Sequence, residues 1–386
     1  MRRLGPLTLL LAACSGPHLD EARSSLDRVT DPGAPPADVA ALVAGNTAFA
    51  TSLHRLLAAA PGNLVYSPYG LSFAMAMTRE NLPLRKAGID AAMGFPLPDG
   101  RLDAAFDALD LGLSSAAGAS ASGGGRQLGV ASAIWSALAL PAPYLDTLAQ
   151  YYGAGVLVGS DPVAAIEAWQ ATQPGDPLPF AVASPCDEAI VNRVRLDAAW
   201  KVAFDPAATR AGDFHRADGR VVAATMMHEE TELAVATTSP RAIELPYDGD
   251  ALSMLIIVPD DLAQLEAQLD PAVLADALGR LSMARVALTL PKLAYQVTLA
   301  PLEAMQALGL PLDSGHYKIS HSARIDANER GTEATALTVV SHTPSAVQQV
   351  TPFVVDRPFF FVIRDRASGT ILFVGRVVDP SAASHD

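Results

Sequence analysis

Near its C-terminus the chain reads FVVDRPFFFVI, residues 353–363. Aromatic and β-branched side chains surround a single proline, and this composition is typical of β-strands. The stretch GTILFVGRVV, residues 369–378, has the same character, and similar runs lie upstream at residues 189–200, 220–227, 251–259 and 285–293. The second half of the chain is therefore predicted to be rich in strands.

The first half has a helical pattern instead. Residues 39–60, VAALVAGNTAFATSLHRLLAAA, place apolar side chains at spacings of three and four, which predicts a helix. In NLVYSPYGLSFAMAMT, residues 63–78, Pro68 suits the first turn of a second helix with Ser67 as its cap. Helices first and strands later predict a single large α+β domain, which a chain of 386 residues can form.

Composition and motifs exclude several classes of function. The formal net charge is −14 and no block of Lys and Arg offsets it, so a nucleic-acid partner is not expected. The sequence contains no HExxH, CxxC, GxSxG or phosphate-loop motif. MMHEETE, residues 226–232, places a His beside acids, but neighbours on a strand point to opposite faces. The sequence therefore predicts no catalytic residue, no metal site and no cofactor.

The N-terminus, MRRLGPLTLLLAACSG, has the layout of an export signal that is too short to span a membrane. Small residues directly before Cys14 resemble the lipobox of bacterial lipoproteins. That resemblance implies a signal peptide over residues 1–13, a lipid on Cys14 and a flexible linker over residues 14–38. By the same analogy Ser15 favours the outer membrane of a bacterial cell envelope. The alternative is an ordinary signal peptide with an incidental cysteine.

Cys186 is the second of the two cysteines in the sequence. With Cys14 assigned to the lipid, it has no partner for an internal disulfide. Its side chain is predicted to act as a small buried hydrophobe and not as a reactive thiol.

Several stretches together resemble one family, the serpins. FVVDRPFFFVI fits the serpin signature, GTILFVGRVVDP resembles the closing strand, and NLVYSP resembles the entry to the helix beneath the main sheet. Residues 190–214 carry Asn192, Trp200, Phe204, Thr209 and Phe214 at the family's spacing, and DGRVVAATMM and LPK add to the match. The resemblance covers residues 39–380 and leaves a tail at residues 381–386. It implies the serpin fold, with helices, a large central sheet, smaller sheets and an exposed reactive-centre loop.

In this family a hinge precedes the reactive-centre loop. The resemblance places the hinge within NERGTEATALTVV, residues 328–340, and the hinge and the loop together span residues 329–352 here. A strand that enters a packed sheet needs one face of small, uncharged side chains. Alternate residues from Thr332 to Val340 meet this condition, and no proline interrupts residues 332–343. The resemblance therefore implies an inhibitory hinge that comprises Glu329, Arg330, Gly331, Thr332, Glu333, Ala334, Thr335 and Ala336.

The family's spacing places the scissile bond between Ser345 and Ala346, and counting back from Pro358 gives Val347 as the alternative. A small, uncharged residue there favours elastase-like or subtilisin-like serine proteases, because the buried Asp of a trypsin-like pocket is left unpaired. The resemblance implies a monomer that forms a covalent complex with its target protease and is itself not an enzyme. The alternative is a non-inhibitory serpin that acts as a carrier, a scaffold or a plain protease substrate.

Four further residues match family positions. Ser67, Asn192 and His321 align with polar residues that hold the central sheet closed, and Trp200 lies where the family places an aromatic residue at the insertion point. A second family serine is replaced by Gly70, which is expected to loosen the closed sheet. The segments after Trp169 and between Gly309 and His321 are shorter than the family pattern. These deletions leave open how the helix that crosses the sheet is arranged.

Overall fold

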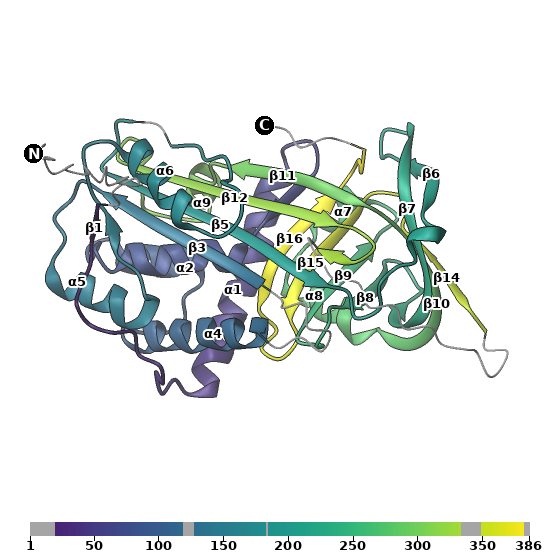
Figure 1. Cartoon of the computed structure of the whole chain (residues 1–386), viewed down its shortest axis with the longest axis horizontal. Helices are drawn as coiled ribbons and strands as arrows, with labels where there is room; N and C mark the ends of the chain where they lie inside the picture. Colours follow the sequence, from purple (N-terminus) through teal and green to yellow (C-terminus); the bar gives the residue numbers. More distant parts are fainter. Residues whose placement is uncertain (1–19, 119–126, 183, 333–348, 382–386) are drawn as a thin grey trace, which may run out of the picture.

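The structure, a computed structural model, describes residues 20–118, 127–182, 184–332 and 349–381. Within these residues the chain forms two β-sheets with helices packed against them (Figure 1). The predicted α+β class is confirmed. Every strand-like stretch named above lies in or overlaps a strand, and the predicted helices begin at Pro36 and Pro68.

The first sheet, called the central sheet below, has seven strands within the described residues. In spatial order they are β1 (Glu21–Ala22), β4 (Val156–Leu157), β3 (Gln127–Ser136), β5 (Glu188–Ala199), β13 (Gly331–Thr332), β12 (Tyr317–Ala327) and β11 (Leu293–Leu299). β5 and β12 are parallel and also pair directly with each other. The short β13 lies between them at one end only.

The second sheet has nine strands within the described residues and lies at the other end of the molecule (Figure 1). Its order is β14 (Thr351–Val354), β10 (Ser282–Pro291), β7 (Val221–Ala236), β8 (Arg241–Pro246), β9 (Leu252–Val258), β15 (Phe359–Asp365), β16 (Ile371–Val377) and β2 (Leu64–Tyr66), with β6 (Arg210–His215) paired to β7. The stretch FVVDRPFFFVI is split between two of these strands. Its first residues end β14 beside β10, and the phenylalanines after Pro358 begin the buried β15.

The helices begin where the sequence supplies caps. α2 (Pro68–Arg79) starts as predicted, because Pro68 occupies the first turn and the Ser67 hydroxyl accepts a hydrogen bond from the Gly70 amide. The other helices are α1 (Pro36–Leu57), α3 (Lys86–Met93), α4 (Arg101–Gly118), α5 (Ala142–Thr147) with the π-helical turn Leu148–Tyr152, α6 (Pro162–Thr172), α7 (Leu262–Ala267), α8 (Pro271–Gly279) and α9 (Leu302–Ala307). Among the described residues, no helix has the length and hydropathy needed to cross a membrane.

Helices cover both faces of the central sheet. On one face, Ile134 and Ile190 belong to the main hydrophobic core together with side chains of α2. On the other face, Ile166 and Trp169 of α6 pack on a separate cluster that includes Trp135. Side chains of successive strand residues thus pack in two different cores, because they point to opposite faces of the sheet. The arrangement of this helix was left open by the short segment after Trp169. The structure shows that α6 is present and packs on this face of the central sheet.

Part of the segment predicted to be a flexible linker is bound to the domain. β1 adds an edge strand to β4, and the Val29 amide donates to the Gln150 carbonyl at 2.8 Å. Arg28 reaches two acids of α4, with Nη2 at 2.7 Å from both Asp107 and Asp110. The contact partners lie more than 75 residues away in the chain, so the polar composition of the segment did not indicate them.

Candidate functional site at the hinge and the seam

The described part of the predicted hinge is seated between two strands of the central sheet. Gly331 pairs with Ala199 of β5, and Thr332 pairs with both Ala198 of β5 and Ala327 of β12. A β-carbon on Gly331 would lie 2.1 Å from the Ala198 carbonyl oxygen, so only glycine fits there. The chain thus enters the sheet at this point.

Glu329 anchors the start of the hinge. Its carboxylate lies 2.7 Å from Lys292 Nζ and accepts a hydrogen bond from the Thr209 hydroxyl at 2.8 Å. Burial opposes ionisation of this group, but the bonds from Lys292 and Thr209 prevail and lower the pKa of Glu329. The exposed Arg330 follows, and its carbonyl accepts a hydrogen bond from the Trp200 amide at 2.8 Å. Lys292 lies in the LPK stretch, but its role was not predicted from the sequence.

Two stacked aromatic rings form hydrogen bonds with the backbone and a side chain of the hinge region. The rings of Trp200 and Tyr247 lie 4.5 Å apart and nearly parallel, at 13°. Trp200 Nε1 donates to the Asn328 carbonyl at 2.9 Å, and the Tyr247 hydroxyl lies 2.8 Å from Thr332 Oγ1. The predicted Trp200 is therefore at the hinge, whereas Tyr247 was missed, because nothing in its local sequence distinguishes it from a core tyrosine.

Beyond the hinge, β5 and β12 pair directly over residues 188–194 and 317–323, a contact called the seam below. Asn192 and His321 face each other across the seam. The Ser67 amide donates to His321 Nε2 at 2.9 Å, and Asn192 Nδ2 donates to the Ser132 hydroxyl at 2.8 Å. The structure thus brings Ser67 to the paired Asn192 and His321 on one face of the seam, while Trp200 lies apart at the hinge.

His321 is fully buried, and burial lowers its pKa to about 3. The ring is therefore neutral at ordinary pH, in keeping with an Nε2 that accepts a hydrogen bond. Within the described residues, His321 Nδ1 and Asn192 Oδ1 have no hydrogen-bond partner. Buried polar atoms without a partner carry a desolvation cost, so this cluster lowers the stability of the closed seam.

Gly70 makes room for Asn192. A β-carbon on Gly70 would lie 2.4 Å from Asn192 Oδ1 and 2.8 Å from a methyl carbon of Val194. The space of the missing serine side chain is therefore occupied by the Asn192 amide, which turns to Ser132 for its hydrogen bond. The substitution is accommodated by close packing at this point and leaves no gap in the seam.

On the opposite face, the segment that follows α6 lies across the seam as a strap, defined here as residues 173–181. The Ala181 amide donates to Ser320 Oγ of β12 at 2.8 Å, and Ser322 Oγ donates to the Pro179 carbonyl. From β5, Arg193 Nη2 donates to the Asp176 carbonyl at 2.9 Å. The short segment after Trp169 thus ties both strands of the seam together.

The connection between α9 and β12 is also compact. Gln306 Nε2 donates to the Leu312 carbonyl at 2.6 Å, and β12 begins at Tyr317. Cys186 is half-buried against the cluster under α6, and burial raises the pKa of its thiol, which fits the predicted unreactive side chain. No group of acids, histidines and cysteines suited to a metal occurs among the described residues.

Several predicted residues fall outside the described part of the chain. They are Cys14, the hinge residues Glu333, Ala334, Thr335 and Ala336, and the candidate scissile-bond residues Ser345, Ala346 and Val347. Their roles stay predictions.

Comparisons with known proteins agree with this architecture. The sequence model of the family described as "Serpin (serine protease inhibitor)" matches residues 44–312 and 314–380. An uncharacterized serpin-like protein of Thermococcus kodakarensis is 29% identical over 364 residues, covering 86% of this chain and 84% of that protein. Bovine antithrombin-III is 30% identical over 216 residues, which span 50% of this chain but only 46% of antithrombin.

A comparison of folds gives the same result. The native-state crystal structure of tengpin, a thermophilic serpin, superposes with a TM-score of 0.81 and covers 93% of this chain and 100% of that one, at 19% identity. The predicted serpin fold is confirmed. With the family model matched over most of its length, the chain belongs to the serpin family.

Proposed function

We propose that the protein is an irreversible inhibitor of serine proteases that acts as a suicide substrate. The serine Oγ of the target attacks the carbonyl carbon of Ser345, the bond to Ala346 breaks, and the new amine of Ala346 takes the serine proton. An ester between the protease and Ser345 remains. Insertion of the freed strand into the central sheet then carries the protease away before water hydrolyses the ester. The inhibitor itself supplies no catalytic group.

The observation that carries this proposal is the register of the hinge. Thr332 lies between Ala198 and Ala327, and the directly paired seam has the same offset between β5 and β12. A strand that continues this register sets Ala334 between Leu196 and Ile325, and later Thr338 between Asn192 and His321. Each inserted residue would therefore separate two residues that are already aligned.

Side-chain size supports the same register. The core-facing neighbours of an inserted strand would be residues 190, 192, 194, 196 and 198 of β5 and their partners in β12, which are buried. The loop residues that would face them are Thr332, Ala334, Ala336, Thr338 and Val340, all small or β-branched. The register reaches the far end of the seam after about eleven residues, or roughly 36 Å at ~3.3 Å per residue.

Two adjacent substitutions test the register. Ala334→Arg would place a charge on the core face between Leu196 and Ile325, where burial without a partner costs several kcal/mol. Glu333→Arg would place the same side chain on the outer face, between Asp197 and Asp326. With an elastase-like protease, we expect an SDS-stable complex for the wild type and for Glu333→Arg, and only cleaved protein for Ala334→Arg.

Complex formation by Ala334→Arg and by the wild type decides between the proposed insertion and its alternatives. If Ala334→Arg forms complex as fully as Glu333→Arg, insertion does not follow this register. If the wild type is only cleaved by elastase-, subtilisin-, chymotrypsin- and trypsin-like enzymes, the protein is a carrier, a scaffold or a substrate. Sequencing the released C-terminal peptide distinguishes Ser345–Ala346 from a cut next to Val347, and faster trapping of trypsin-like enzymes would contradict the proposed specificity.

We also propose that the mature protein is a monomer tethered to a bacterial cell envelope by lipid on Cys14. The bound segment starts at about Asp20, which leaves roughly six residues, or about 20 Å, between the lipid and the domain. The domain would therefore work close to the membrane surface. Cys14→Ser should move the protein from the membrane fraction to the soluble fraction, and an unchanged distribution would contradict the anchor.

A further inference from the structure

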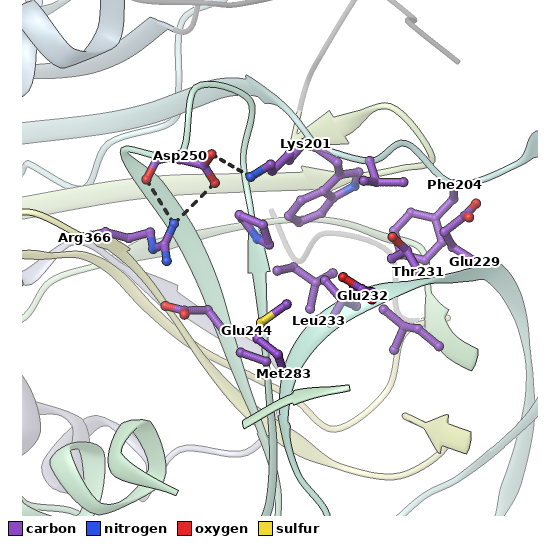
Figure 2. A pocket seen from close by; sticks show the side chains of 16 residues that line it. Lys201, Phe204, Glu229, Thr231, Glu232, Leu233, Glu244, Asp250, Met283 and Arg366 are labelled. Atoms are coloured by element: carbon purple, nitrogen blue, oxygen red, sulfur yellow. Dashed lines mark hydrogen bonds and ion pairs between the residues drawn. The ribbon is translucent and has the colours of Figure 1, made fainter. Parts of the chain in front are cut away.

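A cavity of about 460 Å³ lies beside the hinge, on the second sheet (Figure 2). Apolar side chains of β7, β8 and β10 line it, together with Trp200 and Phe204 from the segment that follows β5. At its edge Met283 is 67% exposed, so the cavity is open to solvent on that side. Volume and lining match those of small-molecule sites, which are mainly apolar with a few polar groups.

The charges around the cavity are unevenly distributed. On one side, Asp250 is shared between Lys201, at 2.6 Å, and Arg366, at 3.3 Å, which leaves a surplus positive charge. On the other side, β7 contributes Glu229 and Glu232 (Figure 2). These two acids belong to the MMHEETE stretch, and the proposed inhibitory mechanism assigns no role to that stretch.

Glu232 is the carboxylate available to a ligand. Its neighbour Glu230 is occupied by Arg285 at 2.8 Å, and Glu244 is occupied by Arg364 at 2.8 Å. Burial raises the pKa of Glu229, which makes its charged form less favourable. Among the residues that the structure describes, Glu232 has neither an ion pair nor a hydrogen bond from its side chain.

We propose that this cavity binds a small organic amine with an apolar body. The body would pack on Phe204 and the leucines of the cavity, and the ammonium group would lie toward Glu232. The positive Lys201 and Arg366 repel an ammonium group and so fix the orientation. This site needs no loop insertion, so it stands or falls independently of protease trapping.

Calorimetric titration of the purified protein with 4-phenylbutylamine tests the proposal. We expect binding at one site per chain, and weaker binding of 4-phenylbutanoate, which has the same body with the opposite charge. If the carboxylate binds as tightly as the amine, or if the amine does not bind at millimolar concentration, the proposal is overturned.

Variants locate the site. Glu232→Gln should weaken amine binding roughly two- to fivefold, the usual effect of an exposed ion pair. Met283→Trp should block the opening and abolish binding. Val221→Trp is the matched control, since Val221 is another exposed apolar residue of the same sheet, 53% exposed and outside the cavity. Thermal unfolding checks that each variant is folded. Amine binding that survives Met283→Trp as it survives Val221→Trp would place the ligand elsewhere and refute the site.

Discussion

His321 shows how one side chain makes the closed seam sensitive to acid. Its pKa is lowered to about 3 by burial, whereas the unfolded chain protonates a histidine near 6.5. Between these values only the unfolded state gains a proton. Native stability therefore falls as the pH drops below about 6.5, by up to about 1.4 kcal/mol per pH unit for this group.

We predict that His321→Gln flattens this dependence, because glutamine accepts the Ser67 amide bond without titrating. The measurement is the urea midpoint of the native state between pH 6.5 and 4.5, for wild type and variant side by side. Other titrating groups are common to both proteins, so the difference in slope belongs to His321. Equal slopes would mean that the buried ring is not neutral in the native state.

Single residues were also the level at which sequence reasoning worked best. The Ser67 and Pro68 start of α2 was predicted, because capping depends on neighbours in sequence. The grouping of Ser67 with Asn192 and His321 was predicted only through the resemblance to serpins, because the contacts of these residues join α2, β5 and β12. Tyr247 and Lys292 were not predicted at all, since their roles depend on what lies opposite them in the fold.

Among the elements, the N-terminal segment differs most from its sequence-based prediction. It was expected to be a flexible linker, but β1 and Arg28 attach it to β4 and α4. Asp107 is completely buried, and burial raises its pKa while Arg28 opposes this effect. The ordered linker therefore supplies the cation that pairs with this buried carboxylate.

Arg28→Ala should accordingly destabilise the native protein by about 2 kcal/mol, because Asp107 is left buried without its cation. Arg23→Ala is the control from the same segment. Arg23 is 48% exposed, donates to the Gly153 carbonyl and lies 3.8 Å from the Glu21 carboxylate. Because this ion pair is exposed and long, the loss of Arg23 should cost no more than about 0.5 kcal/mol. Denaturant unfolding of both variants measures the difference. Similar losses would show that Arg28 is not the attachment point.

At the scale of the whole molecule, the residues alone predicted the α+β class but not the order of the strands in the two sheets. Composition indicated strands in the second half, and the resemblance supplied the fold. Pairing was beyond the local sequence, since β5 joins strands from residues 127–136 and 317–327. The seam itself is held by Ser67 and His321 on one face and by the strap on the other.

A native state held in this way is stable for kinetic reasons if the lower-energy form has the loop inserted at the seam. Cleavage of the loop removes its tether and should let β13 extend between β5 and β12. The seven residue pairs between β5 and β12 would be lost, and each inserted residue would instead pair with one residue of β5 and one of β12, which gives twice as many pairs.

The most direct test is therefore the melting temperature after a single cut in the loop. The protein is nicked within residues 341–348 by a protease that does not remain bound, and both fragments are kept together in the sample. We predict that the nicked protein melts far above the intact one, because the freed strand completes the central sheet. A melting temperature equal to or below that of the intact protein would show that the loop does not insert, and the proposed inhibitory mechanism would be wrong.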